Sequence, residues 1–196
     1  MNFPILSSLI LLPVVGSLFL LFSKDKNSNT GKYVALFTSF VNFLISLYLW
    51  YQFDPTTSDF QFVEDREWLK GIINYKIGID GISILFIVLT ALITPLCIIS
   101  VNNTVKDRLR DFLIAILVME SLMIGVFCSL DLVIFYLFFE AGLIPMFLII
   151  GIWGGARRVY SAFKFFLYTL LGSVLMLIAI ISIYWISGTT DITQLY

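Results

Sequence analysis

Histidine is absent from this sequence of 196 residues, and charged residues make up only 13% of it. The absence of histidine removes the usual axial ligand of haem, the commonest zinc ligand and the usual proton shuttle at neutral pH. No glycine-rich motif of the dinucleotide-binding or P-loop kind is present either. We therefore expect no catalytic, cofactor-binding or metal site on this chain.

Cysteine is also scarce, since Cys97 and Cys128 are the only two and both lie within apolar runs. Two isolated thiols predict small packing residues rather than a disulfide framework. The formal net charge is −1, and no basic stripe marks a nucleic-acid surface. Hydrophobic residues make up 60% of the chain, which is more than a soluble domain can cover with polar surface. The expected solvent is therefore a lipid bilayer.

Long apolar runs predict the fold class. A helix needs about 20 apolar residues to cross a bilayer, and six such stretches predict an all-α, polytopic membrane protein. They run over Phe3–Phe22, Tyr33–Tyr51, Gly81–Val101, Phe112–Leu130, Leu132–Ile152 and Phe165–Ile186. The fourth and fifth form one apolar block that is too long for a single span, so we expect a tight turn at Ser129-Leu130-Asp131.

Charge alternates between the predicted loops and predicts an orientation. The first, third and fifth loops carry Lys24, Lys26, Lys32, Lys106, Arg108, Arg110, Arg157, Arg158 and Lys164. The second loop, at about residues 52–80, is mostly acidic, and the fourth loop and the tail carry Asp131 and Asp191. Because basic loops stay on the cytoplasmic or matrix side, both termini are expected on the opposite side.

Two carboxyl groups lie within predicted spans, Glu140 in the fifth and Glu120 in the fourth. A charge at mid-membrane costs roughly 2.5–3.5 kcal/mol on insertion scales, so both residues are functional candidates. Counted from the turn at 1.5 Å per residue, Glu120 and Glu140 lie roughly 16 and 14 Å deep. Facing carboxyls at one depth would each favour a proton on the other, although spacing leaves the facing directions open. Proton loading and release is the simplest chemistry here, and a packing hydrogen bond is the alternative.

Three further residues near Glu140 are of interest. Pro145 removes the helical hydrogen bond to the carbonyl of Ala141, which could then bind water, and a simple kink is the alternative. Gly142 would allow another helix to approach closely. Lys164 lies at the inside end of the sixth span, at a depth far from Glu140. It is a candidate proton relay or counter-charge, or else an anchor whose charged end reaches the membrane surface.

Several segments, taken in order, resemble one family. Phe138-Phe139-Glu140-Ala141-Gly142-Leu143-Ile144-Pro145-Met146 resembles the glutamate helix of the antiporter-like subunits of respiratory NADH dehydrogenases. Ile152-Trp153-Gly154, Lys164-Phe165-Phe166-Leu167-Tyr168-Thr169 and Gly78-Ile79-Asp80-Gly81-Ile82-Ser83 also look like this family. Gln52-Phe53-Asp54-Pro55 and Phe60-Gln61-Phe62-Val63-Glu64 are similar to its mitochondrial type. The resemblance is to the N-terminal part of the chain 4 / subunit M family of NADH:ubiquinone oxidoreductase, respiratory complex I.

The resemblance implies a function. Such subunits belong to the membrane arm of the H⁺-translocating NADH:ubiquinone reductase and take part in proton translocation coupled to electron transfer from NADH to ubiquinone. FMN, iron–sulfur clusters, NADH and ubiquinone would be bound by other subunits. The family's proton-translocation carboxylate maps onto Glu140. A second glutamate at Glu120 and a lysine at Lys164 are features of some members only.

The resemblance also implies an incomplete antiporter-like subunit, because family members have many more helices. Residues 1–130 would hold four helices and the acidic outside loop, and residues 131–196 the start of the proton-translocating domain. The expected partners are other membrane-arm subunits and a separate chain that carries the C-terminal half. The expected location is the mitochondrial inner membrane, with both termini toward the intermembrane space, and a bacterial inner membrane is the alternative.

Two other functions are compatible with these residues. One is a subunit of a sodium/proton antiporter, against which the mitochondrial look of residues 52–64 argues. The other is a purely structural membrane-arm module in which Glu140 serves only assembly. Replacement of Glu140 by Gln would separate proton translocation from a structural role.

Overall fold

The structure, a computed structural model, describes residues 4–22, 29–69, 73–101, 105 and 107–195. It contains the helices α1 (Ile5–Phe22), α2 (Asn29–Gln52), α3 (Ser83–Ser100), α4 (Leu109–Cys128), α5 (Leu132–Trp153) and α6 (Arg158–Ser187). All six are long and apolar enough to cross a membrane, which confirms the predicted spans and the all-α class. Residues 129–131 separate α4 from α5, as predicted, whereas α6 begins seven residues earlier than the expected Phe165.

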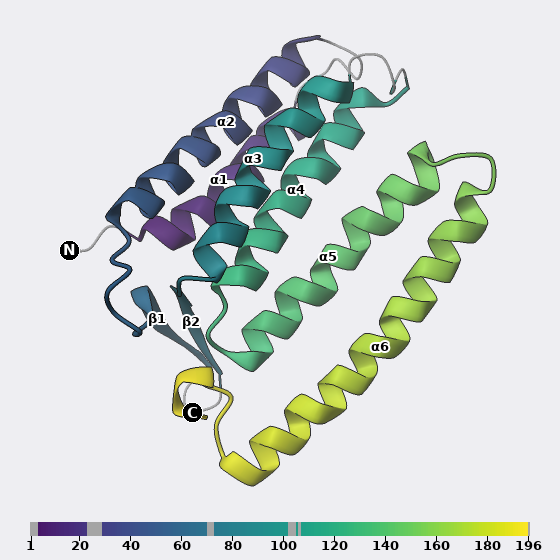
Figure 1. The fold of residues 1–196 in the computed structure, drawn as a ribbon. Coiled ribbons are helices and arrows are strands. Elements are labelled where there is room, and N and C mark those ends of the chain that lie inside the picture. The colour runs from purple at the N-terminus through teal and green to yellow at the C-terminus, as the bar shows by residue number, and fades with distance from the viewer. Residues whose placement is uncertain (1–3, 23–28, 70–72, 102–104, 106, 196) are drawn as a thin grey trace.

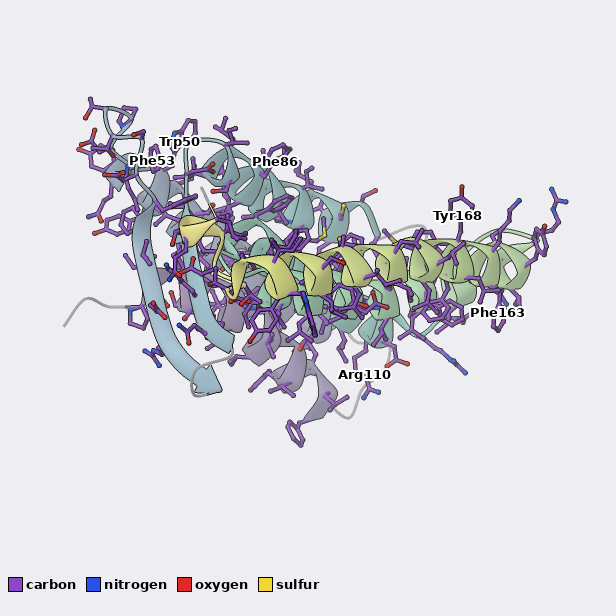
Figure 2. All side chains as sticks on the ribbon, turned by 90° about the horizontal axis from the view of Figure 1, so that it is seen from below. Trp50, Phe53, Phe86, Arg110, Phe163 and Tyr168 are labelled. Atoms are coloured by element: carbon purple, nitrogen blue, oxygen red, sulfur yellow. The ribbon has the colours of Figure 1, made fainter. Side chains whose placement is uncertain are left out.

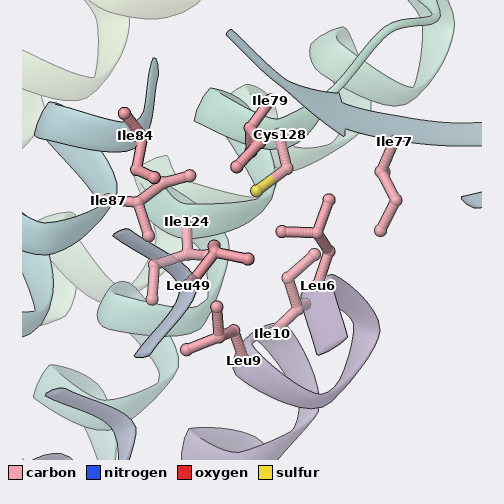
Figure 3. Close-up of a cluster of buried hydrophobic side chains, with 10 residues drawn as sticks. All are labelled: Leu6, Leu9, Ile10, Leu49, Ile77, Ile79, Ile84, Ile87, Ile124 and Cys128. Atoms are coloured by element: carbon pink, nitrogen blue, oxygen red, sulfur yellow. The ribbon is translucent and has the colours of Figure 1, made fainter. Parts of the chain in front are cut away.

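The helices form two regions (Figure 1). Helices α1–α4 pack together in a bundle, α5 packs along α4, and α6 packs along α5 at the outer edge. A cluster of buried apolar side chains fills one end of the bundle, as Figure 3 shows; it comprises Leu6, Leu9, Ile10, Leu49, Ile77, Ile79, Ile84, Ile87, Ile124 and Cys128. A second cluster fills the other end, with Leu20, Ala35, Ile98, Leu113 and Leu117. The bundle therefore has a core of its own.

The acidic segment between α2 and α3 holds an antiparallel hairpin of β1 (Gln61–Leu69) and β2 (Ile73–Ile79). We expected only a polar loop here, because the charges of β1 hide the alternation that marks a strand. The register of β1 is irregular, and Phe62 has a positive φ of 53°. The fully buried Ile77 and Ile79 of β2 explain the hairpin, because they close the end of the bundle.

The hairpin also caps α1. Glu64 of β1 accepts hydrogen bonds from the backbone N–H groups of Leu6 (2.9 Å) and Ser7 (3.3 Å), and from the Ser7 hydroxyl. The first N–H groups of a helix have no partner within the helix, and the helix dipole favours a negative charge beside them. A strand far along the sequence thus supplies the N-terminal cap of the first helix.

Two further segments add backbone hydrogen bonds beside the hairpin at the same end of the bundle. The α4–α5 turn pairs with β2 through the backbone, where the N–H of Leu130 donates to the carbonyl of Lys76 (3.0 Å). The C-terminal segment pairs in turn with the α4–α5 turn, where the N–H of Ile192 donates to the carbonyl of Leu130 (2.9 Å). The hairpin, the turn and the C-terminal segment therefore lie together at the lower left of Figure 1.

Polar side chains reinforce this attachment. Asp131 caps α5 by accepting from the N–H groups of Val133 and Ile134, and it accepts from the Thr190 hydroxyl at 2.6 Å. Lys76 forms a largely buried ion pair with Asp191 at 2.7 Å. Burial raises the pKa of Asp191, but hydrogen bonds from Lys76 and Thr193 outweigh it and hold that pKa below its ordinary value.

The basic residues predicted to face the inside lie toward the opposite end of the helices. Arg108 precedes α4, and Arg157 precedes α6. Lys24, Lys26 and Lys106 lie outside the described residues. The predicted orientation of this arrangement across the membrane stays a prediction.

Candidate functional site

Glu140 lies within α5, which begins at Leu132 and receives its N-terminal cap from Asp131. The side chain is half-buried, and its Oε2 atom is buried with no hydrogen-bond partner among the described residues. Neither of the ion pairs found in the described part of the chain includes it. A carboxyl at mid-helix without a counter-charge is a candidate functional group in a membrane-spanning helix.

The helical register places Glu140 on the side of α5 that faces α6. Phe147 and Gly151 follow it by seven and eleven residues, close to two and three whole turns, so the three share a face. Phe147 packs against Phe166 with ring centroids 5.5 Å apart. A Cβ atom at Gly151 would lie 3.5 Å from that of Ala162. Both contacts are with α6.

The contact between α5 and α4 uses another face of α5. Phe138, about 160° around the helix from Glu140, packs so closely on Gly125 that a Cβ atom there would lie 2.6 Å from its ring. Glu140 therefore does not point at α4 across this contact, and Glu120 is not its partner there. The two carboxyls lie at similar depth but on different faces of the helices that carry them.

Ser173 of α6 is a residue that the sequence analysis missed. When the antiparallel contacts of Phe147 with Phe166 and of Gly151 with Ala162 are continued along both helices, Ser173 falls opposite Glu140. Its side chain is 2% exposed, and its hydroxyl donates to the carbonyl of Leu170 at 3.0 Å. A serine within the apolar run of the sixth predicted span was the available signal.

Glu120 belongs to the bundle instead. It is 2% exposed and accepts a hydrogen bond from the amide of Asn42 on α2, with 2.9 Å between Nδ2 and Oε1. The Oε2 atom of Glu120 and the Oδ1 atom of Asn42 are buried without partners among the described residues. The next residue, Ser121, points to α1, where its hydroxyl donates to the carbonyl of Ile10 at 2.6 Å.

Lys164 lies in the second turn of α6, away from both carboxyls. Its side chain is exposed, its Nζ atom is 6.0 Å from the ring centre of Tyr160, and it lines a shallow hollow with Tyr168. Figure 2 shows Tyr168 projecting away from the rest of the molecule. Along the α5–α6 contact Lys164 is about nine residues from the level of Glu140, or roughly 14 Å. The two do not form a direct pair.

Pro145 is buried within α5, and the helix continues through it from Leu132 to Trp153. Proline has no N–H group, so the carbonyl of Ala141 loses its helical donor one residue after Glu140. At Gly142 a Cβ atom would meet nothing within 4 Å. Within this chain no second helix uses Gly142 as a close-contact point in the residues that the structure describes.

Known proteins match this chain over nearly its whole length. Residues 129–196 match a family described as NADH:quinone oxidoreductase/Mrp antiporter, transmembrane. NADH-quinone oxidoreductase subunit M of Rhodobacter capsulatus is 60% identical over 171 residues, which cover 87% of this chain and 32% of that protein. NADH-ubiquinone oxidoreductase chain 4 of Marchantia polymorpha and that of Arabidopsis thaliana are each 49% identical over 189 residues, covering 95% of this chain and 38% of theirs. The chain thus spans about a third to two-fifths of the length of these relatives.

Two solved structures share the fold. A chain of respiratory complex I from Thermus thermophilus with bound NADH matches with a TM-score of 0.82 and 32% identity, over 97% of this chain and 38% of that one. A chain of the membrane-bound sulfane sulfur reductase, an archaeal respiratory membrane complex, matches with a TM-score of 0.83 and 17% identity, over 96% and 39%. The second likeness concerns the fold alone.

Proposed function

We propose that this chain is a membrane-arm subunit of an NADH:quinone oxidoreductase, because it is similar over most of its length to subunit M and chain 4 of such complexes. It takes part in proton translocation coupled to electron transfer from NADH to quinone. Two observations support this proposal: the 60% identity with subunit M of Rhodobacter capsulatus over 171 residues, and the unpartnered buried Oε2 atom of Glu140 within α5. The redox groups of the reaction belong to other subunits.

Glu140 is the group that binds and releases the proton. Its buried Oε2 atom has no hydrogen-bond donor among the described residues, so this atom remains available to a proton or to a donor from another helix. No cation in the described part of the chain pairs with it. The carbonyl of Ala141, freed by Pro145, offers an acceptor for a water that would carry the proton onward.

Two other residues have supporting roles in this proposal. Glu120 is a second proton-binding group, enclosed in the bundle. Lys164 is a surface-anchored relay or counter-charge at the end of α6, where its exposed ammonium group lies far from Glu140. The sodium/proton antiporter function is the less favoured alternative, because the relatives over most of this chain are named as NADH dehydrogenase subunits.

The proposed partners follow from the open faces of α5 and α6. Large apolar side chains such as Ile144, Leu171 and Leu175 are exposed there, and they need lipid or further helices to cover them. A separate polypeptide that carries the remaining helices of the family would complete the domain that begins at residue 131, after the bundle of residues 1–130. The location is a mitochondrial inner membrane with both termini toward the intermembrane space, or a bacterial inner membrane.

Native electrophoresis of mildly solubilised membranes, with mass spectrometry of the band that holds this chain, tests the assembly. Comigration with NADH dehydrogenase activity and with a polypeptide that carries the missing helices is the expected result. Comigration with cation antiporter subunits, without NADH dehydrogenase activity, would overturn the proposal.

Glu140→Gln tests the proton-carrying role in the assembled complex. Gln keeps the shape and a hydrogen-bonding end but cannot release a proton. NADH-driven proton uptake into sealed vesicles is expected to fall at least about tenfold, equivalent to about 1.4 kcal/mol or more, with normal assembly. Glu140→Asp is the matched control and should retain part of the activity. Normal pumping in the Gln variant would leave only a structural role.

A further inference from the structure

Asn42 of α2 is a buried polar residue at the centre of the bundle. It is fully buried, and it belongs to a polar stripe on the interior face of α2 that also contains Thr38, Ser39 and Ser46. The hydroxyls of these three side chains bond to backbone carbonyls of α2 itself. Asn42 is therefore the member of the stripe whose side chain reaches across to another helix, where it meets Glu120.

The pair is enclosed by apolar side chains at both ends. Leu117, one turn before Glu120, belongs to one buried cluster, and Ile124, one turn after it, belongs to the other. On α2, Ala35 and Leu49 lie two turns before and after Asn42, and each belongs to one of the two clusters. An ionised carboxylate in such surroundings costs several kcal/mol unless a cation or several donors compensate it.

No cation compensates Glu120 from the helices packed around it. Helices α1 and α3 contain no acidic or basic residue at all. In α2 the only charged residue is Lys32, about 15 Å along the axis from Asn42, and in α5 it is Glu140, which faces α6. On α4 itself Arg110 and Asp111 lie ten and nine residues away, at the end of the helix, where they pair with each other.

The hydrogen bond between Asn42 and Glu120 leaves two oxygen atoms, both of them acceptors, without a donor among the described residues. Asn42 Nδ2 donates to Glu120 Oε1, and the two remaining atoms, Glu120 Oε2 and Asn42 Oδ1, are both buried acceptors without a donor. A primary amide and a carboxylic acid are complementary, because each offers one donor and one acceptor side by side. A single proton on Oε2 would donate to Oδ1 and satisfy both atoms at once.

We infer that Glu120 is a neutral carboxylic acid in the resting protein and that Asn42 holds its proton in a cyclic pair of two hydrogen bonds. Asn42 is thus a positioning residue for a buried proton-binding site inside the α1–α4 bundle. The inference holds whether or not the chain takes part in proton pumping, since it concerns the resting state of the bundle. Any release of this proton requires that the bond to Asn42 break first.

Infrared spectroscopy of the native membrane complex that contains this chain tests the inference, because a protonated carboxyl has a carbonyl stretch that is separate from the amide bands. The spectrum of wild type minus Glu120→Gln, at about pH 8, is expected to show the loss of one protonated-acid band. This pH is well above the ordinary glutamate pKa of about 4.3. A difference spectrum that shows loss of carboxylate bands instead would overturn the inference.

Asn42→Leu tests the pairing itself. Leucine has a similar volume and neither donor nor acceptor, so the acid band should move to higher wavenumber as the carbonyl loses its N–H donor. The matched control is Ser46→Ala, one turn away on the same stripe, which should leave the band in place. An unchanged band in Asn42→Leu would show that Asn42 does not hold the proton.

A second measurement tests the inference if the Glu120→Gln variant does not assemble. Wild type, Asn42→Leu and Ser46→Ala complexes labelled with carboxyl-¹³C glutamate should then be compared. Isotope labelling identifies the protonated glutamate bands by their shift. One of these bands should differ from wild type in Asn42→Leu and not in Ser46→Ala. If no protonated glutamate band responds to Asn42→Leu, the inference is wrong, whatever the activity of the complex.

Discussion

The α1–α4 bundle and the α5–α6 pair are both built from long apolar helices, but they differ in how much of their surface is buried within the chain. In the most apolar stretches of α1–α4, 33–44% of the residues are buried, against 17% in α5 and 11% in α6. The mid-helix carboxyls differ in the same way, since Glu120 has an amide partner inside the bundle, whereas Glu140 lies on the side of α5 that faces α6 and has no hydrogen-bond partner for its buried Oε2 atom among the described residues. The bundle completes its own interior, whereas α5 and α6 present a surface that other helices or lipid must cover.

The largest expected effect comes from filling the contact that joins the two regions. Gly125→Leu places a side chain where the ring of Phe138 already lies, so α5 must move away from α4. Overpacking of this kind costs about 1–3 kcal/mol, and occasionally more. We expect loss of the assembled complex in native electrophoresis.

Gly142→Leu is the matched control for that variant, because a Cβ atom at Gly142 would have no contact within 4 Å among the described residues. Normal assembly of Gly142→Leu would show that no closely packed helix covers this side of α5. Assembly lost as completely as in Gly125→Leu would show that further helices cover Gly142, and would place the open face of α5 at an interface.

Asp131→Ala is expected to have the next largest effect. It removes the cap of α5 and leaves the Thr190 hydroxyl without its acceptor. Loss of an N-terminal cap costs about 0.5–2 kcal/mol, and we expect a lower temperature of disassembly. Asp131→Asn retains an acceptor oxygen and should recover most of the loss. A variant as stable as wild type would show that the C-terminal segment does not depend on this attachment.

Acidification should loosen the C-terminal segment by a smaller amount. Because the pKa of Asp191 is lowered in the folded protein, its stabilising contribution is present above the ordinary aspartate value of about 3.9 and is lost as the pH falls through the lowered pKa. Amide exchange at Ile192, corrected for the intrinsic effect of pH, should therefore increase between about pH 7 and pH 3.

Lys76→Met is the control for this pH dependence. It should raise exchange at Ile192 at neutral pH and reduce the further increase on acidification, since the ion pair with Asp191 is already absent. An undiminished pH response in Lys76→Met would assign the effect to another carboxyl.

The smallest effect is expected at Lys164. Its exposed side chain and its distance from Glu140 favour a limited role, so Lys164→Gln should change NADH-driven pumping by less than about twofold, or about 0.4 kcal/mol. A loss of pumping as large as that of Glu140→Gln would assign Lys164 to the proton path. The functional residues of the α5–α6 pair would then reach the N-terminal end of α6.

The six spans were predictable because hydropathy and length are properties of the sequence itself, and so was the turn at residues 129–131. The hairpin was not, because Glu64 and Asp65 mask the pattern of β1 and the reason for its folding is the burial of Ile77 on distant helices. The sequence predicted that Glu120 and Glu140 lie near the middle of the fourth and fifth helices, as they do in α4 and α5. It could not give their facing directions, since these depend on how Phe138 packs on Gly125.

Asn42 was the most informative omission from the sequence analysis. A lone asparagine in an apolar span carries the same signal as a lone carboxyl, because an unpaired amide is also costly in hydrocarbon. Considered together with Glu120, it would have suggested a polar contact between the second and fourth helices.

The cap that Glu64 provides has a consequence for synthesis of the protein. The first turn of α1 is made 58 residues before the carboxylate that will accept its N–H groups. While the ribosome is still making α2, these N–H groups have only water or lipid headgroups as acceptors. Helix α1 therefore reaches its final state only after the hairpin has been made and has folded back over it, which couples this span to a much later segment of the chain.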